Sequence, residues 1–568
     1  MDWTEATRPT LTADLVIGGR ERIVDQVCRW LTGEPRALGL QADVPEEAIA
    51  FLAASLERLP PPLRDAHLAR ALLIRDPTAW WQVLVADQPL LLVPVSEDID
   101  ASQAVRRGHH VFVPLGKESS PSLDAIELPR LRWEAAKNAL KAMGIPENRV
   151  DDLAGLARRS LFSLRRKLAL SPGLKQPSWA QPAEGHNVIP AMLAGSWDDR
   201  KDGDREIVAF LANKPYEDII RVITRWAHES DPPVRRIGNA WLLVSKEDAW
   251  SQLARLITPV DLGRFEEVIL KVLSAPDPSL ELPSNRRWAA EIFGKGRFYS
   301  DLLRKGLSDS LALMGARSET PFSDGSSPQD HVKRIIDQLL RKANNDQNGD
   351  LWASLSDLLP LLSEAAPEIF LGAVDEGLSG DQPILINLFT DTNHQNSPFP
   401  RSPHTGLLWA LENLAWHPDH LGHAALFLAK LDRLDPGGVL SNRPFRSLSQ
   451  IFLLLRPQTA ATAESRLHVL DLLRKREPAV AWRLLVDLLP QYHIFSTSIH
   501  TPRWRDWQPD EEPQVTYGEL DQFVREILNR LLIDVGTDGS RWGDLIKRLS
   551  SLPVELQDEV IDRLSNYR

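Results

Sequence analysis

The sequence predicts a mostly α-helical protein of several domains, with an α/β region at its N-terminal end. Three features support this prediction: short apolar runs alternate with helical patterns up to about residue 175, amphipathic segments fill the second half, and 42 prolines fall mostly between apolar runs. Hydrophobic residues make up 43% of the chain and charged residues 25%, which is typical of globular proteins. The length of 568 residues is enough for about three to five domains.

The α/β domain is expected over residues 1–175. After an apolar lead-in at residues 14–19, helices are predicted by the 3.6-residue spacing of apolar side chains, and strands by short apolar runs that Pro or Gly bounds. Such runs suit a buried parallel sheet. A helical lid is expected at residues 151–170. The predicted helices are 21–33 and 46–60, the second ended by a run of prolines, and the predicted strands are 37–42, 69–76, 88–95 and 109–116.

A winged-helix domain is expected over residues 186–275. Three helical patterns are followed by two short strand-like runs, and Gly238 and Asn239 join the two runs. Two residues of this kind favour a tight β-hairpin. Three helices and a hairpin in this order are typical of a winged helix. The predicted helices are 187–197, 204–214 and 216–230, and the predicted strands are Val234–Ile237 and Ala240–Val244.

The rest of the chain, residues 276–568, is expected to form helical repeats. Its amphipathic segments are too short to be stable alone, so each must stack on its neighbours. Their period is irregular, which predicts HEAT-like stacking. Two long breaks, at 389–404 and 493–514, are of a length that is usually functional or disordered. The predicted helices are 330–343, 351–365, 405–418, 419–434, 463–477, 478–491 and 517–532.

The turn that follows the first predicted strand is where a phosphate-binding loop would lie. Such a loop reads Gly-x-x-x-x-Gly-Lys-Ser/Thr, because glycines let backbone N–H groups approach the phosphate and lysine supplies charge. Here the turn holds Asp43, Pro45, Glu46 and Glu47, without glycine or lysine. We expect Asp43 to be the N-cap and Glu46 its N3 partner. The protein's own carboxylates then fill the helix N-terminus, so we expect no bound triphosphate and no cofactor, although ATP or ADP is not excluded.

A resemblance to the STAND or NACHT-like NTPases begins with Gly19, Arg20 and Glu21, which match a Gly-Arg-Glu motif that precedes the first strand of that family. The lid, the winged helix and the repeats follow in the family's order, so the resemblance covers the whole chain. It implies cofactor contacts by Gly19, Arg20 and Glu21. It also implies an acidic strand end for metal, for which the chain offers Glu97 and Asp98 beyond the apolar run.

The resemblance also implies a function, since some bacterial STAND relatives act in antiviral defence. Relatives often carry an N-terminal effector domain, whereas this sequence starts close to Gly19. We therefore expect a non-catalytic interaction or sensor scaffold that works with a protein partner, which supplies any enzyme activity. A nucleotide-regulated switch with an unorthodox phosphate site is the first alternative.

The second alternative is a scaffold that binds nucleic acid. Its phosphate contacts would come from the lid and from the second domain, where a helix would enter a groove and the hairpin would contact the backbone. Glu217 and Asp218 oppose this interpretation, because they place negative charge at the start of that helix. The solvated face of a helix is the ordinary explanation of the basic run. The candidate residues are Arg158, Arg159, Arg165, Arg166, Lys167, Arg221, Arg225, Arg235 and Arg236.

A cluster of arginine and tryptophan in the second long break has two interpretations. Arg503, Trp504, Arg505 and Trp507 are suited to cation–π contacts. The cluster either anchors a protein partner or fixes the loop to the helical stack.

The three histidines within residues 417–423 have a spacing that only partly suits a zinc site. Histidines at the start of a helix are the simpler explanation of this group.

Cysteine content and charge limit the location and the partners. The single cysteine, Cys28, allows no intrachain disulfide, and no basic and apolar leader is present, so a cytoplasmic location is expected. No run of about 18 apolar residues predicts a membrane helix. The net charge of −12 argues against a globally basic nucleic-acid binder.

Overall fold

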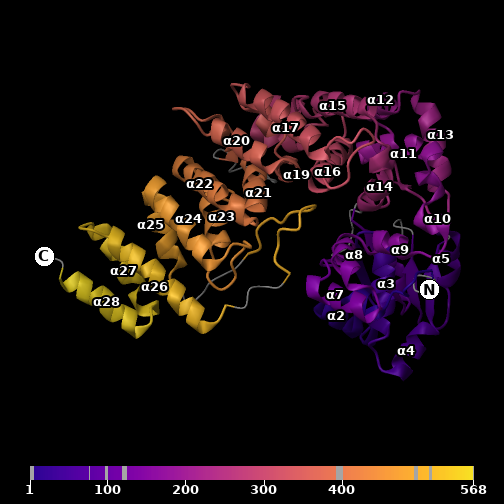
Figure 1. The fold of residues 1–568 in the computed structure, drawn as a ribbon, viewed down its shortest axis with the longest axis horizontal. Helices are drawn as coiled ribbons and strands as arrows, with labels where there is room; N and C mark the ends of the chain where they lie inside the picture. The colour runs from indigo at the N-terminus through magenta and orange to yellow at the C-terminus, as the bar shows by residue number, and fades with distance from the viewer. Residues whose placement is uncertain are drawn as a thin grey trace. The chain divides into compact units, whose positions relative to one another are not determined.

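The computed structural model describes residues 6–75, 77–95, 100–117, 125–391, 401–490, 497–510 and 515–566. The chain divides into two compact units, Met1–Pro259 and Val260–Arg568 (Figure 1). Helices dominate both units, as the amphipathic pattern predicts. Among the described residues, no helix combines the length and the apolar character needed to cross a membrane.

The first unit contains the parallel sheet that the apolar runs predict. Its described strands lie in the order β2-β3-β4-β1-β5, and every neighbouring pair is parallel. The four predicted strands are present, whereas β5 was not expected because it has only three residues. The strands are β1 (Ala37–Ala42), β2 (Ala71–Ile74), β3 (Leu91–Pro94), β4 (His110–Gly116) and β5 (Ala125–Glu127).

Helices pack on this sheet through side chains that the sequence spaces for burial. Trp30 on α2 and Phe51 on α3 are almost fully buried in the same core as Phe112 of β4. The apolar lead-in is a short helix, and the prolines after α3 also begin α4, since Pro is tolerated in a first helical turn. The helices are α1 (Ala13–Ile17), α2 (Glu21–Thr32), α3 (Pro45–Leu56), α4 (Pro61–Leu68), α5 (Pro77–Val83), α6 (Ala101–Arg106), α7 (Trp133–Ala142), α8 (Glu147–Arg159), α9 (Leu161–Leu168) and α10 (Pro172–Lys175).

The same unit continues into three helices and an antiparallel sheet of order β6-β8-β7. The hairpin predicted around Gly238 is confirmed, and Gly238 has the positive φ of 57° that such a turn favours. Trp197 and Trp241 stack across the sheet with ring centroids 6.1 Å apart. The elements are α11 (Pro182–Ala194), β6 (Ser196–Asp198), α12 (Asp202–Ala212), α13 (Tyr216–Ala227), β7 (Val234–Ile237), β8 (Ala240–Leu243) and α14 (Lys246–Leu253).

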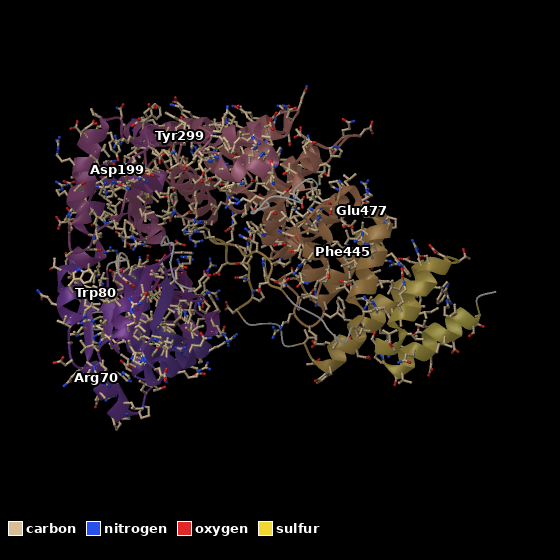
Figure 2. The ribbon with its side chains drawn as sticks, turned by 180° about the vertical axis from the view of Figure 1, so that it is seen from behind. Arg70, Trp80, Asp199, Tyr299, Phe445 and Glu477 are labelled. Atoms are coloured by element: carbon tan, nitrogen blue, oxygen red, sulfur yellow. The ribbon has the colours of Figure 1, made fainter. Side chains whose placement is uncertain are left out.

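The second unit is a stack of helices in which alternate helices form rows. In each row, every helix packs against the next one. The first row consists of α16, α19, α21, α23, α25 and α27, and the second row consists of α17, α20, α22 and α24. Ion pairs between Arg474 and Asp534 and between Arg530 and Asp471 tie α24 to α26. Figure 2 labels Phe445 of α23 and Glu477, which follows α24. The helices are α15 (Pro259–Leu273), α16 (Asp301–Ala316), α17 (Pro328–Asn344), α18 (Asp350–Ser354), α19 (Leu359–Ala365), α20 (Pro367–Gly377), α21 (His404–Ala415), α22 (Pro418–Leu434), α23 (Pro444–Ile451), α24 (Ala463–Arg476), α25 (Pro478–Leu488), α26 (Tyr517–Asp534), α27 (Gly539–Arg548) and α28 (Val554–Ser565).

Candidate functional site

The candidate site lies at the carboxyl ends of β1 and β4, which are neighbours in the parallel sheet. The chain leaves β1 toward β2 on one side of the sheet and leaves β4 toward β5 on the other. Open parallel sheets bind ligands at such a reversal of strand order, outside the carboxyl ends of the strands. We therefore examined which side chains occupy this edge.

The turn after β1 differs from the expected cap. The N-cap of α3 is Val44, which makes no side-chain capping bond, and Pro45 is the first helical residue. The prediction that Asp43 caps the helix with Glu46 is therefore wrong. Asp43 accepts a hydrogen bond from Ser245 Oγ at 2.9 Å instead, and its backbone oxygen accepts one from the N–H of Lys117. Asp43 thus joins the sheet edge to the residues that precede α14.

Glu47, in the first turn of α3, forms a buried ion pair with Arg20. Glu47 Oε1 lies 3.3 Å from Arg20 Nη2, and each residue is only 4% exposed. Arg20 also donates from Nε to the backbone oxygen of Pro129 at 2.6 Å and from Nη1 to that of Val16 at 3.1 Å. The guanidinium is thus held by protein acceptors, and its position fixes the start of α2 against the start of α3.

Burial raises the pKa of Asp43 to about 7, and the negative charge of Glu47 adds to the rise. The charge of Lys117 and hydrogen bonds with Ser160 and Ser245 oppose it. Burial likewise raises the pKa of Glu47, while the charges of Arg20 and Lys117 lower it in part. Two carboxyl groups that lie close together in a poorly solvated place make the edge unfavourable for a further negative charge.

Sequence reasoning missed Lys117, which follows β4. It lies 74 residues after Asp43 in the chain, and only the parallel pairing of β1 with β4 brings the two residues together. Arg235 of β7 also reaches this edge, because a Cβ added to Gly116 would lie 2.8 Å from Arg235 Nη2. Both cations therefore come from distant segments rather than from the local turn.

The two other residues of the Gly-Arg-Glu motif shape the backbone. Gly19 has a φ of 76°, and a Cβ at this position would lie 2.2 Å from Arg132 Cγ. Only glycine fits such a place. Glu21 begins α2, and its Oε1 accepts the N–H of Gly19 at 3.2 Å. The structure thus brings Arg20 of the motif to the candidate site and places Gly19 and Glu21 in the turn before α2. Glu97 and Asp98 lie outside the residues that the structure describes.

Arg166, a candidate phosphate contact, is buried in an ion network. It donates from Nε to Asp248 at 2.8 and 2.9 Å, and from Nη1 and Nη2 to Asp231 at 2.7 and 2.8 Å. Its exposed fraction is 2%. Burial raises the pKa of Asp248 to about 6 although Arg166 lowers it. Arg166 thus joins α9 to α14 and does not face solvent.

The remaining candidate nucleic-acid contacts are scattered. Arg158 is buried over the ring of Trp133, at 5.6 Å from its centroid, whereas Lys167 is exposed, and Arg159, Arg165 and Arg235 are half-buried. Three others pair with nearby acids: Arg221 with Asp218 at 3.5 Å, Arg225 with Glu184 at 2.7 Å, and Arg236 with Asp199 at 2.8 Å. Asp199 is labelled in Figure 2. In each of these pairs the carboxylate offsets part of the positive charge that a phosphate contact needs.

In the second unit, the arginine and tryptophan cluster packs against the helices. Trp504 is 2% exposed and donates from Nε1 to Asp309 at 3.0 Å. Arg503 forms an ion pair with Asp309 of α16, Arg505 donates from Nε to the backbone oxygen of Glu364, and Arg505 lies over Trp507 at 5.5 Å. In this conformation the indole of Trp504 is not available to a partner.

Two histidine groups of the second unit are also candidates for a chemical role. His417 caps α22, as the sequence indicates, and its ring lies against His420 and Trp507. Sequence reasoning did not single out Ser402 and His404, whose side chains meet at 2.7 Å. Both are buried, and the other ring nitrogen of His404 binds the backbone oxygen of Asn442, so this pair is not open to a substrate. Within the described ranges, no group of acids, cysteines and histidines is arranged to hold a metal ion.

Comparisons of this chain with protein-family models, curated proteins and solved structures gave no match. The chemistry of the candidate site therefore has to be argued from its own geometry.

Proposed function

We propose that the protein is a non-catalytic interaction scaffold with a degenerate STAND-like NTPase domain at its N-terminal end. The Arg20–Glu47 ion pair is the observation that carries this proposal. A helix N-terminus at the end of a parallel strand would receive a phosphate through free backbone N–H groups and positive charge. Here the first turn of α3 offers Pro45, which has no N–H, and two glutamates. The site is filled by protein charges that a phosphate would have to displace.

The arrangement of elements supports the rest of the assignment. The order α11, β6, α12, α13, β7, β8 and the hairpin β7–β8 support a winged helix within residues 186–275. The two rows of alternating helices support HEAT-like repeats over residues 276–568. A role in bacterial antiviral defence is the setting that the sequence resemblance implies, and a cytoplasmic location is the one that the single cysteine favours.

A scaffold of this kind acts through a protein partner, and purification from its native cells tests this. The tagged chain is isolated at low salt and analysed by light scattering after size-exclusion chromatography. We expect a complex whose mass exceeds that of the chain, with a different protein in fixed stoichiometry. Elution of the chain without another protein, as a monomer or as an oligomer of itself, would contradict the proposal.

A nucleotide-regulated switch is the second candidate, and Lys117 is the observation that favours it. Lys117 supplies a positive charge beside Asp43 and Glu47 from the end of β4. If a nucleotide displaced Glu47, Arg20 and Lys117 would be the side chains left to bind its phosphates. The two candidates differ in one property, the affinity of the folded chain for ATP and ADP.

A further inference from the structure

Residues 497–507, here called the crossing segment, lie across one row of helices in the second unit. Figure 1 shows this part of the chain between α25 and α26 without helix or strand. The contacts run from α23 to α16, opposite to the order of the helices in the sequence. The backbone of Thr497 and Ile499 bonds to Gln450, in the last turn of α23, and to Gln458, in the segment that follows this helix. The next contacts are made to α21, α19 and α16.

Three buried carboxylates receive the crossing segment, one from each of these helices. Glu412 of α21 accepts the backbone N–H of His500 at 2.7 Å. Glu364 of α19 accepts three consecutive backbone N–H groups, those of residues 503, 504 and 505, at 2.8, 2.7 and 3.2 Å. Asp309 of α16 accepts the Trp504 indole N–H and lies 3.1 Å from Arg503 Nε. We call Asp309, Glu364 and Glu412 the acidic row.

Most of this recognition uses the backbone of an extended chain, which any sequence provides. The specific part comes from three side chains: the Trp504 indole and the Arg505 guanidinium donate hydrogen bonds to the helices, and Arg503 forms an ion pair with Asp309. Stacked helical repeats commonly bind extended segments along such a row. With the crossing segment in place the acidic row is 0 to 5% exposed, and the N–H groups of the segment supply hydrogen bonds that buried carboxylates require.

We propose that the face formed by α16, α19, α21 and α23 is a peptide-binding site, and that the crossing segment is its intramolecular ligand. A protein partner would enter this site with an extended segment that carries Arg-Trp-Arg chemistry, and it would displace residues 497–507. The charge of the acidic row and the chemistry of the present occupant define that partner segment. This inference deepens the proposed scaffold function and rests on it.

A peptide titration tests the site directly. A fluorescent peptide of residues 497–510 is added to the full chain and to the R503A/W504A variant, in which the internal segment holds less tightly. We expect the variant to bind the peptide at least about tenfold more tightly than the wild type, because the internal competitor is weakened. A scrambled peptide and a peptide with the same two alanines are the controls. E364Q in the variant background is expected to lower the affinity about tenfold.

The proposal is overturned if a folded variant binds the 497–510 peptide no better than the scrambled one. If R503A/W504A does not melt cooperatively, the W504F variant is titrated in its place, since it keeps a six-membered aromatic ring and removes the pyrrole ring together with the N–H donated to Asp309. Absence of binding to that variant would overturn the proposal equally. The titration needs no partner, so peptide binding by a chain that purifies alone would refute the scaffold and leave the site standing.

Discussion

Asp43 combines burial with a neighbouring negative charge, and this makes the stability of the first unit depend on pH. Its pKa of about 7 in the folded state exceeds the usual aspartate value, so the folded protein retains a proton that the unfolded chain releases. The stability contributed by this proton is complete below the unfolded pKa and is lost as the pH rises through about 7. Asp248, with a pKa of about 6, contributes in the same direction at lower pH.

Replacing Asp43 by asparagine should remove this part of the pH dependence. Between pH 6 and pH 8 we expect the wild type to lose about 1.4 kcal/mol more unfolding free energy than D43N, the value of one pKa unit. Urea unfolding of both proteins at the two pH values measures the difference. Asp248 is present in both proteins, so its contribution to the pH dependence of the unfolding free energy cancels in the comparison. Equal losses in the two proteins would show that Asp43 is ionised in the folded state throughout this range.

At the level of secondary-structure elements, the Arg20–Glu47 pair joins the start of α2 to the start of α3. Glu46 and Glu47 are adjacent in the same first turn, yet only Glu47 pairs with Arg20. Removing one partner of a buried pair leaves an uncompensated charge and typically costs about 3–5 kcal/mol. Glu47→Gln is therefore expected to lower the free energy of unfolding by about 3 kcal/mol.

Glu46→Gln is the matched control, with an expected loss below about 0.5 kcal/mol. Chemical denaturation of the two variants and the wild type at pH 7.5 gives the comparison. Similar losses for E46Q and E47Q would mean that the pair with Arg20 has no special role in the first turn of α3.

The spacing of apolar residues and the residue types at turns predicted the helices and strands more accurately than the contacts at the ends of those helices and strands. The runs that became β1 to β4 are mostly apolar, although β2 at the edge of the sheet leaves Leu72 and Leu73 partly exposed, whereas Ala125–Glu127 is too short to give such a signal. The Gly238 turn was predicted because its residue type fixes its backbone. The cap of α3 was not predicted, because Pro45 sets the helix start one residue later and Ser245, far along the chain, takes the Asp43 side chain.

On the scale of the whole molecule, the contacts that define the two candidate sites join distant parts of the sequence. Asp43 meets Ser245 across 202 residues, and Trp504 meets Asp309 across 195. Composition and periodicity report on neighbours within one element, so they carry no signal for such pairs. The sequence identified Arg20 and Trp504 as residues of interest. For Arg20 the resemblance implied a cofactor contact, whereas the structure pairs it with Glu47. For Trp504 the sequence left open whether the side chain faces a partner or the protein itself.

The charges at the edge of the sheet are the reason why we expect that a single lysine does not make a phosphate site there. Asp43, Glu46 and Glu47 gather at the turn, where the charge of Lys117 acts on Asp43 and Glu47 and the charge of Arg20 acts on Glu47. A triphosphate adds several negative charges to this place and would have to break a buried ion pair first. We therefore infer that the protein's own side chains take the place of a nucleotide.

Isothermal titration calorimetry with ATP and with ADP, in the presence of magnesium, tests this claim most directly on the full chain. We expect no saturable heat up to roughly 1 mM of either nucleotide. Saturable binding with a micromolar Kd would contradict it and would identify the protein as a nucleotide-controlled switch. In that case, loss of the binding in Lys117→Met would assign the phosphates to the edge formed by β1 and β4.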